Sequence, residues 1–186
     1  MMNKSIGSIE FRSIAKGIEV SNEMVKKSYV DILYLKSICP GKFIIIISGD
    51  TGEVNTAVEH GLSISQGFVV DSFVINSVHE SIIGSLKNKY EPINEVNCIG
   101  VMETSKVCAG LKALDKTLKS SDTTIIKLQL SFAIGGKLVY IVCGSLSSVN
   151  YGIDEGKKEL KDKDVIQALV MPHVDEKIIK HLIGRG

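Results

Sequence analysis

The stretch Ile6-Gly7-Ser8-Ile9-Glu10 begins a pattern that the chain contains twice. It returns as Ile99-Gly100-Val101-Met102-Glu103, an offset of 93 positions. The same offset joins further identical residues: Gly17/Gly110, Lys26/Lys119, Ser28/Ser121, Ile32/Ile125 and Leu35/Leu128. Two residues are then inserted in the second copy, and Gly41-Lys42 matches Gly136-Lys137 at an offset of 95. Self-similarity at a fixed offset over this length indicates a duplicated structural unit.

Strand and helix patterns alternate in the same order within each copy. In the first copy, four stretches have the residue content of strands: 6–11, 30–35, 43–48 and 68–78. The helix expected after the first strand has three apolar residues on one face: Ile14, Ile18 and Val25. The corresponding face in the second copy has four: Val107, Leu111, Leu114 and Leu118.

A second helix is expected after the turn Gly49-Asp50-Thr51-Gly52, which is predicted to hold the helix cap. That turn lacks the Gly-Lys-Ser/Thr ending of a phosphate-binding loop. Residues 79–86 read as a short closing helix, and the second copy closes with a strand at 165–171 and a helix at 175–182.

This βαββαβ order predicts the α/β (α+β) class. We expect two tandem ferredoxin-like domains, each a mainly antiparallel four-stranded sheet flanked by helices. A polar stretch with Pro92 separates the copies. The predicted division is therefore a first domain at 4–90, a linker at 91–97 and a second domain at 98–184.

Composition narrows the function classes. The 22 basic and 21 acidic residues are spread along the chain, so no basic stripe for nucleic acid is expected. The longest strongly apolar run, 43–47, is far below the roughly 20 residues of a membrane helix. The start of the chain has no apolar signal-peptide core, which favours a cytoplasmic protein without a membrane partner. The lack of Trp and a positive mean hydropathy suggest burial of surface against other copies.

Cys39 lies in a short loop, 35–43, between two apolar runs. Pro40 fixes its own φ and biases Cys39 toward an extended backbone, while Gly41 permits a turn that other residues resist. We therefore expect a stiff, exposed bend that presents the thiol. The two-residue insertion of the second copy falls on the corresponding loop, 131–136, which has no cysteine. Three further cysteines lie in strand or helix patterns and are expected to be structural: Cys98, Cys108 and Cys143.

Taken together, these motifs resemble the bacterial microcompartment (BMC) shell-protein family, and within it the branch whose chains have two tandem domains and form trimers. The resemblance is strongest to the T-type members of propanediol-utilisation microcompartments. The carriers of the resemblance are Ile6-Gly7-x-Ile9-Glu10, Ser13 to Gly17, Met24-Val25-Lys26, Ser37 to Lys42, and Gly49-Asp50. The resemblance implies a structural shell protein that is not an enzyme. Three chains would form a homotrimer, a pseudohexamer of six BMC domains, which tiles with other BMC shell proteins into a layer.

By the same resemblance, loops from each domain line a central pore. The pore-loop residues implied are Ser37, Ile38, Pro40 and Gly41 in the first copy and Phe132, Ala133, Ile134 and Gly135 in the second. The assembly-edge residues implied are Lys26 and Lys119. Cys39 is the implied metal ligand, and three Cys39 side chains would hold one 4Fe–4S cluster per trimer on the threefold axis. Symmetry would supply the thiolates that one chain lacks.

The function that the resemblance implies is the transfer of electrons, or of a cluster, across the shell. Redox enzymes of the lumen would be the partners. Three other interpretations stay open. The first is a passive metabolite pore without a cluster, in which Cys39 is a rim residue. The second is an enzyme with Cys39 as nucleophile, which would need a base; His79 and His173 lie at strand ends, and nothing in the sequence ties them to Cys39. The third is a ferredoxin-like sensor of small ligands.

Overall fold

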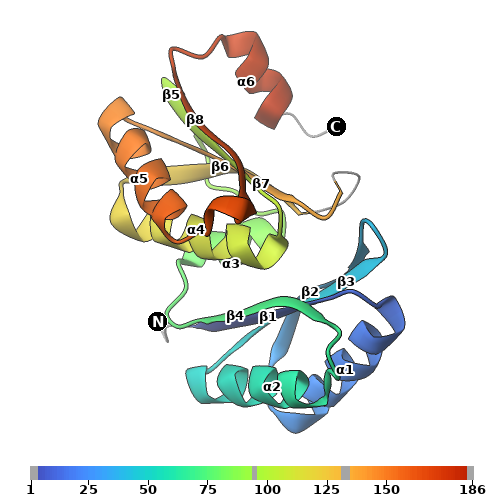
Figure 1. The fold of residues 1–186 in the computed structure, drawn as a ribbon. Coiled ribbons are helices and arrows are strands. Elements are labelled where there is room, and N and C mark those ends of the chain that lie inside the picture. The colour runs from blue at the N-terminus through green and yellow to red at the C-terminus, as the bar shows by residue number, and fades with distance from the viewer. Residues whose placement is uncertain (1–3, 94–95, 131–134, 184–186) are drawn as a thin grey trace. The chain divides into compact units, whose positions relative to one another are not determined.

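The computed structural model describes residues 4–93, 96–130 and 135–183. The chain forms two compact units (Figure 1), and each contains one four-stranded antiparallel sheet. One unit contains β1 to β4, and the other contains α3 to α6. The α/β class and the two antiparallel four-stranded sheets predicted from the sequence are confirmed.

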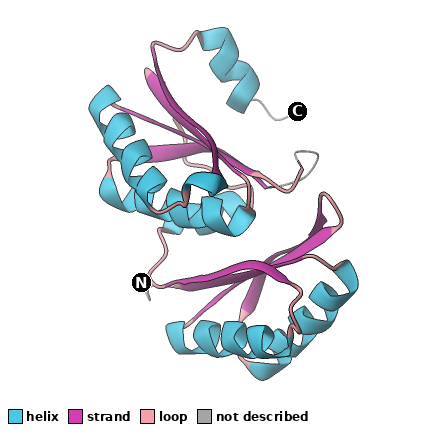
Figure 2. Ribbon diagram, in the orientation of Figure 1, coloured by secondary structure: helices cyan, strands magenta, loops and turns pink. Residues whose placement is uncertain are grey.

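The first unit has the predicted βαββαβ order. Its elements are β1 (Ser5–Phe11), α1 (Ile14–Lys27), β2 (Asp31–Ile38), β3 (Lys42–Gly49), α2 (Thr51–Ile64) and β4 (Val69–Ile75). The strands are ordered β2-β3-β1-β4, so that β2 and β4 are the edges. Helices α1 and α2 pack on one face of the sheet (Figure 2) over a core that includes Ile9, Phe11, Met24, Ile45 and Ile47.

The second unit repeats this arrangement. It contains β5 (Cys98–Thr104), α4 (Val107–Ser120), β6 (Thr123–Leu130), β7 (Leu138–Gly144), α5 (Leu146–Lys158), a 3₁₀ turn (Asp162–Asp164), β8 (Val165–Pro172) and α6 (Glu176–Ile183). The strand order is β6-β7-β5-β8. Helices α4 and α5 cover one face of this sheet, and α6 lies over the other (Figure 1), where Ile179 and Leu182 pack on Ile99, Ile126, Ile141 and Cys143.

Helix caps follow the sequence in part. Ser13 and Ser145 precede α1 and α5, and each side-chain oxygen accepts a hydrogen bond from a first-turn backbone N–H. Asp50 stands at the N-cap position of α2, within the turn that was predicted to hold the cap, but its side chain makes no capping hydrogen bond.

Three features differ from the expectation. Strand β2 runs to Ile38 and not to Leu35, and β4 ends at Ile75, before Ser77 adopts a φ of +50°. Helix α3 (Glu80–Leu86) packs against β6, so this closing helix of the first copy lies in the second unit (Figure 1). The division at 91–97 therefore stays a prediction about the sequence repeat.

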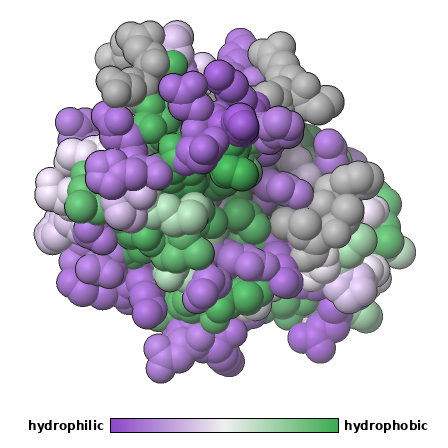
Figure 3. Space-filling model, turned by 90° about the horizontal axis from the view of Figure 1, so that it is seen from above, coloured by the Kyte–Doolittle hydropathy of each residue, from purple (hydrophilic) through white to green (hydrophobic). Residues whose placement is uncertain are grey.

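The apolar face of α1 is also not where the pattern suggested. Ile14, Ile18 and Val25 are 39%, 54% and 37% exposed, and the face that packs inward consists of Gly17, Val20, Ser21 and Met24. The corresponding face of α4 is buried. Figure 3 shows hydrophobic side chains among hydrophilic ones on one surface of the molecule. Among the described residues, no helix is long and apolar enough to cross a membrane.

Candidate metal centre

Cys39 lies at the end of the β2–β3 hairpin. The two strands pair down to Ile38 opposite Lys42, and only Cys39, Pro40 and Gly41 connect them. Gly41 has a φ of +68°, in the left-handed region that glycine adopts without strain, as the sequence predicted. The Cys39–Pro40 peptide bond is cis. Cys39 is exposed, so this short loop presents its thiol to the surroundings.

An ion pair holds the base of this hairpin to the centre of the sheet. The Lys42 Nζ lies 2.6 Å from Glu10 Oε1, and the two side chains are only 17% and 0% exposed. Because Lys42 directly follows the loop, this contact ties the start of β3 to β1. The second copy has the corresponding pair, Lys137 and Glu103, at 2.8 Å, with both side chains more exposed.

The predicted pore-loop residues fall into three groups. Ser37 and Ile38 are the last two residues of β2, and Ile38 is buried. Their role in lining a pore stays a prediction. Pro40 and Gly41 form the turn and are exposed. The predictions for Phe132, Ala133 and Ile134 lie outside the described residues. Gly135 is exposed, with a φ of +70°.

The other three cysteines are buried, as expected for structural residues. Burial raises the pKa of the Cys98 thiol. The pKa of the Cys143 thiol is raised mainly by burial and, to a smaller extent, by the electrostatic effect of the nearby Cys98. Both are therefore kept as thiols and are poor metal ligands, because the thiolate is the ligand form. Within the described ranges, no three His, Cys, Asp or Glu side chains come together to hold a metal ion. One chain thus offers one accessible thiol.

This difference in burial predicts the labelling pattern of the metal-free protein. Iodoacetamide applied to the native chain should modify Cys39 at least about ten times faster than Cys98, Cys108 or Cys143, because only Cys39 is exposed. Peptide mass spectrometry after a timed reaction measures this. In denaturant all four should react at similar rates, and fast native labelling of a buried cysteine would contradict the assignment.

The two predicted edge lysines lie near the C-terminal ends of α1 and α4. Lys26 pairs with Glu23 at 2.9 Å and keeps 65% of its side chain exposed. Lys119 pairs with Asp115 at 2.5 Å and is 39% exposed. Lys26 is therefore the more available of the two for a contact with another molecule. The edge role of both residues stays a proposal.

His79 and His173 both lie in connections between elements, and the His79 side chain makes no capping hydrogen bond. His79 stands at the N-cap position of α3, and its backbone N–H donates to Asp115 Oδ1 at 2.9 Å. His173 has a φ of +57° in the connection before α6. Its backbone N–H donates to the carbonyl of Asn97 at 2.8 Å.

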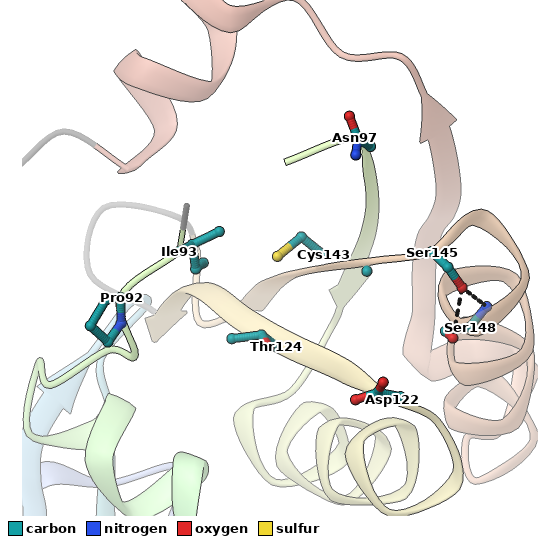
Figure 4. Close-up of a pocket in the computed structure, with 9 residues that line it drawn as sticks. Pro92, Ile93, Asn97, Asp122, Thr124, Cys143, Ser145 and Ser148 are labelled. Atoms are coloured by element: carbon teal, nitrogen blue, oxygen red, sulfur yellow. Dashed lines mark hydrogen bonds between the residues drawn. The ribbon is translucent and has the colours of Figure 1, made fainter. Parts of the chain in front are cut away.

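A separate cavity of about 550 Å³ lies in the second unit, where β7 leads into α5 (Figure 4). Its lining includes Ile93 and Cys143, and Thr124, Ser145 and Ser148 add hydroxyl groups. Ser145 Oγ caps α5, accepting from the Ser148 N–H at 3.1 Å. The lining holds one carboxylate, that of Asp122, and none of the residues predicted as ligands, so this cavity is not the predicted metal site.

The match to a known family covers both copies. The BMC domain matches the chain at residues 5–78 and again at 98–174. The chain belongs to the BMC-domain family. Within this family it is 32% identical, over 183 residues, to the bacterial microcompartment shell protein PduT of Citrobacter freundii. The match covers 98% of this chain and 99% of that protein.

Solved structures agree with this placement. A crystal structure of a microcompartment protein from Desulfitobacterium hafniense DCB has a TM-score of 0.86 and 28% identity, covering 95% of this chain and 98% of that one. The structure of a fused permuted hexameric shell protein from the RMM microcompartment has a TM-score of 0.64, and the match covers 84% of this chain and 83% of that one. Its sequence identity is 16%, so this likeness shows the fold alone. The BMC resemblance is confirmed, and membership makes this a structural shell protein, not an enzyme.

Proposed function

We propose that this chain is a homotrimeric tile in the shell of a cytoplasmic bacterial microcompartment, with one 4Fe–4S cluster on its threefold axis for electron transfer across the shell. The observation that carries the proposal is the exposed Cys39 at the end of a short hairpin in a tandem BMC chain. Two BMC domains per chain require three chains to complete a six-domain ring.

The residues fit such a cluster only in an assembly. A cluster takes three or four thiolate ligands, and each chain offers one accessible thiol, since the other cysteines are buried. Three chains around one axis would bring three Cys39 side chains to a point. The second copy's loop has no cysteine and would contribute walls to the opening but no ligand.

A bound cluster would supply one-electron transfer. The chain's own residues would hold and orient its ligands. Gly41 lets the turn close, Ile38 anchors the end of β2 in the fold, and the Lys42–Glu10 pair fixes the start of β3. Cys39 would therefore be held by a rigid hairpin, which favours ligation at a fixed distance from the axis.

The outer rim of each trimer would contact other BMC shell proteins and extend the layer. The exposed Lys26 is the candidate for this edge, with Lys119 as its counterpart. Redox enzymes of the lumen would be the electron partners on one side of the layer.

Iron and acid-labile sulfide in anaerobically reconstituted protein test the cluster. The wild-type trimer should bind about four irons, with visible absorption and an EPR signal on reduction. Cys39→Ser should lose them while light scattering still shows a trimer, because Cys39 is exposed and its replacement disturbs no core. Cys143→Ser serves as the control and should keep its iron.

Trimers that bind no iron in the wild type would overturn the cluster and leave a passive metabolite pore. Iron retained by Cys39→Ser would also overturn it, because another ligand set would then be required.

A further inference from the structure

Two glycines at the end of the second copy's loop, Gly135 and Gly136, belong to the first unit. Both have a left-handed backbone, with φ of +70° and +79°. Their surroundings differ, however. A Cβ on Gly135 would have no atom of the described residues within 4 Å, whereas a Cβ on Gly136 would collide with the backbone oxygen of Cys39. Gly136 is therefore the point at which the second copy's loop lies directly against the loop that carries the candidate ligand.

The repeat shows that this close approach is not a general need of the turn. Gly136 corresponds in the first copy to Gly41, which has a φ of +68°. A Cβ on Gly41 would have no atom of the described residues within 4 Å. The two glycines thus share a backbone conformation, but only one of them has a neighbour that excludes a side chain. The contact at Gly136 follows from where the second copy's loop lies, and not from the shape of the turn.

The hairpin that Gly136 contacts cannot easily move away from it. The contacted atom of Cys39 is a backbone oxygen, so it can shift only if the loop shifts with it. On one side of the loop, Ile38 ends β2 and is 4% exposed. On the other side, Lys42 begins β3, and its Nζ lies 2.6 Å from the buried Glu10 Oε1. The same Nζ would lie 3.1 Å from a Cβ on Gly136, so any side chain there presses on the hairpin at two points.

We propose that Gly136 is a positioning residue for Cys39. Its lack of a side chain lets the second copy's loop rest against the Cys39 carbonyl, which holds the thiol-bearing loop in place. The second copy has no cysteine in this loop, and it contributes to ligation through the position of the first copy's ligand. The inference deepens the proposed 4Fe–4S site and rests on it. Because a misplacement of about 1 Å disturbs a site that needs fixed geometry, a methyl group at position 136 should weaken the cluster.

Alkylation of Cys39 in the metal-free protein tests the contact without the cluster. Gly136→Ala should raise the rate at which iodoacetamide modifies Cys39 by at least about threefold, because the displaced loop loses its support. Gly135→Ala is the matched control, because it places the same methyl group on a left-handed backbone with open space around it. It should leave the rate within about 1.5-fold of the wild type. A rate in Gly136→Ala that matches the control, or falls below it, would overturn the inference.

The reconstituted protein supplies a second measurement. Gly136→Ala should retain less than about half of the wild-type iron after the same exposure to air, and the EPR signal of its reduced cluster should change in shape. Gly135→Ala should keep both. A faster alkylation of Cys39 with unchanged iron and EPR signal would overturn the positioning of the ligand. Wild-type trimers without iron would overturn the cluster itself, and the alkylation rates would then still decide whether Gly136 holds the loop.

A crosslink decides the case if Gly136→Ala does not fold. Gly135 is exposed and its surroundings leave room for a side chain, so Gly135→Cys should be tolerated. The metal-free variant is treated with a short bis-maleimide, and the monomer band of a denaturing gel is digested for mass spectrometry. We expect a peptide that bridges Cys39 and position 135, because the neighbouring Gly136 lies against the Cys39 carbonyl. A monomer band without this bridged peptide would overturn the contact.

Discussion

Lys42→Met is expected to destabilise the protein by about 3–5 kcal/mol, because it removes the cation that lies against a buried carboxylate. The Glu10 side chain is fully buried, and the Lys42 Nζ is 2.6 Å from it. Methionine keeps the length and apolar stem of lysine, so the lost charge dominates the effect. Urea unfolding followed by circular dichroism measures the change in the free energy of unfolding.

The second copy supplies a matched control for this prediction. In the Lys137–Glu103 pair the side chains are 39% and 30% exposed, so solvent can take over the solvation of Glu103. Lys137→Met should therefore cost no more than about 1 kcal/mol. The double variant Glu10→Gln with Lys42→Met should recover much of the loss. Equal losses for Lys42→Met and Lys137→Met would show that burial of Glu10 is not the cause.

The repeat explains why so much of the fold could be predicted. Two copies of one pattern had to satisfy one topology, so an ambiguous stretch in one copy could be interpreted from the other. The apolar stretch Phe43 to Ile47 predicted a central strand, and β3 is central and buried. Ser13 and Ser145 each cap a backbone N–H of the helix that follows, a local signal that the prediction of these helices did not use.

Placement of elements across the repeat boundary could not be predicted in the same way. The pattern of α3 shows that it needs an apolar partner but not which sheet provides it. The stripe Ile14, Ile18 and Val25 likewise indicates burial, and the single chain leaves it exposed. An amphipathic pattern predicts that an apolar face is covered. It does not distinguish cover by the same chain from cover by another copy.

At the candidate site, the exposed loop could be predicted from the sequence, but the ion pair that holds the base of the hairpin could not. The local backbone preferences of Pro40 and Gly41 predict a turn, and a turn at this place predicts that Cys39 is exposed. The ion pair beneath joins Glu10 to a residue 32 positions away, and only the fold brings the two together. A signal was nevertheless present, because Glu10 with Lys42 and Glu103 with Lys137 occupy matching places in the two copies.

Substitution of the glycines at which α1 and α4 approach their sheets is expected to have the second large effect on stability. A Cβ on Gly17 would lie 2.6 Å from Phe43 Cδ1 and 2.8 Å from its Cβ, and a Cβ on Gly110 would lie 2.6 Å from Leu138 Cδ2. Phe43 and Leu138 are buried, so neither can move aside freely. Gly17→Ala and Gly110→Ala should each destabilise by about 1–3 kcal/mol through overpacking.

The two substitutions act in separate units, so the double variant should lose roughly the sum, about 2–6 kcal/mol. Gly52→Ala is the matched control, because it is also a helical glycine but has no atom within 4 Å of the added Cβ. It should stabilise α2 by up to about 1 kcal/mol, since alanine is the better helix former. Urea midpoints at unchanged slope measure all four proteins. A stabilised Gly17→Ala variant would mean that α1 can move away from β3, and the close contact would then not be what fixes the spacing between helix and sheet.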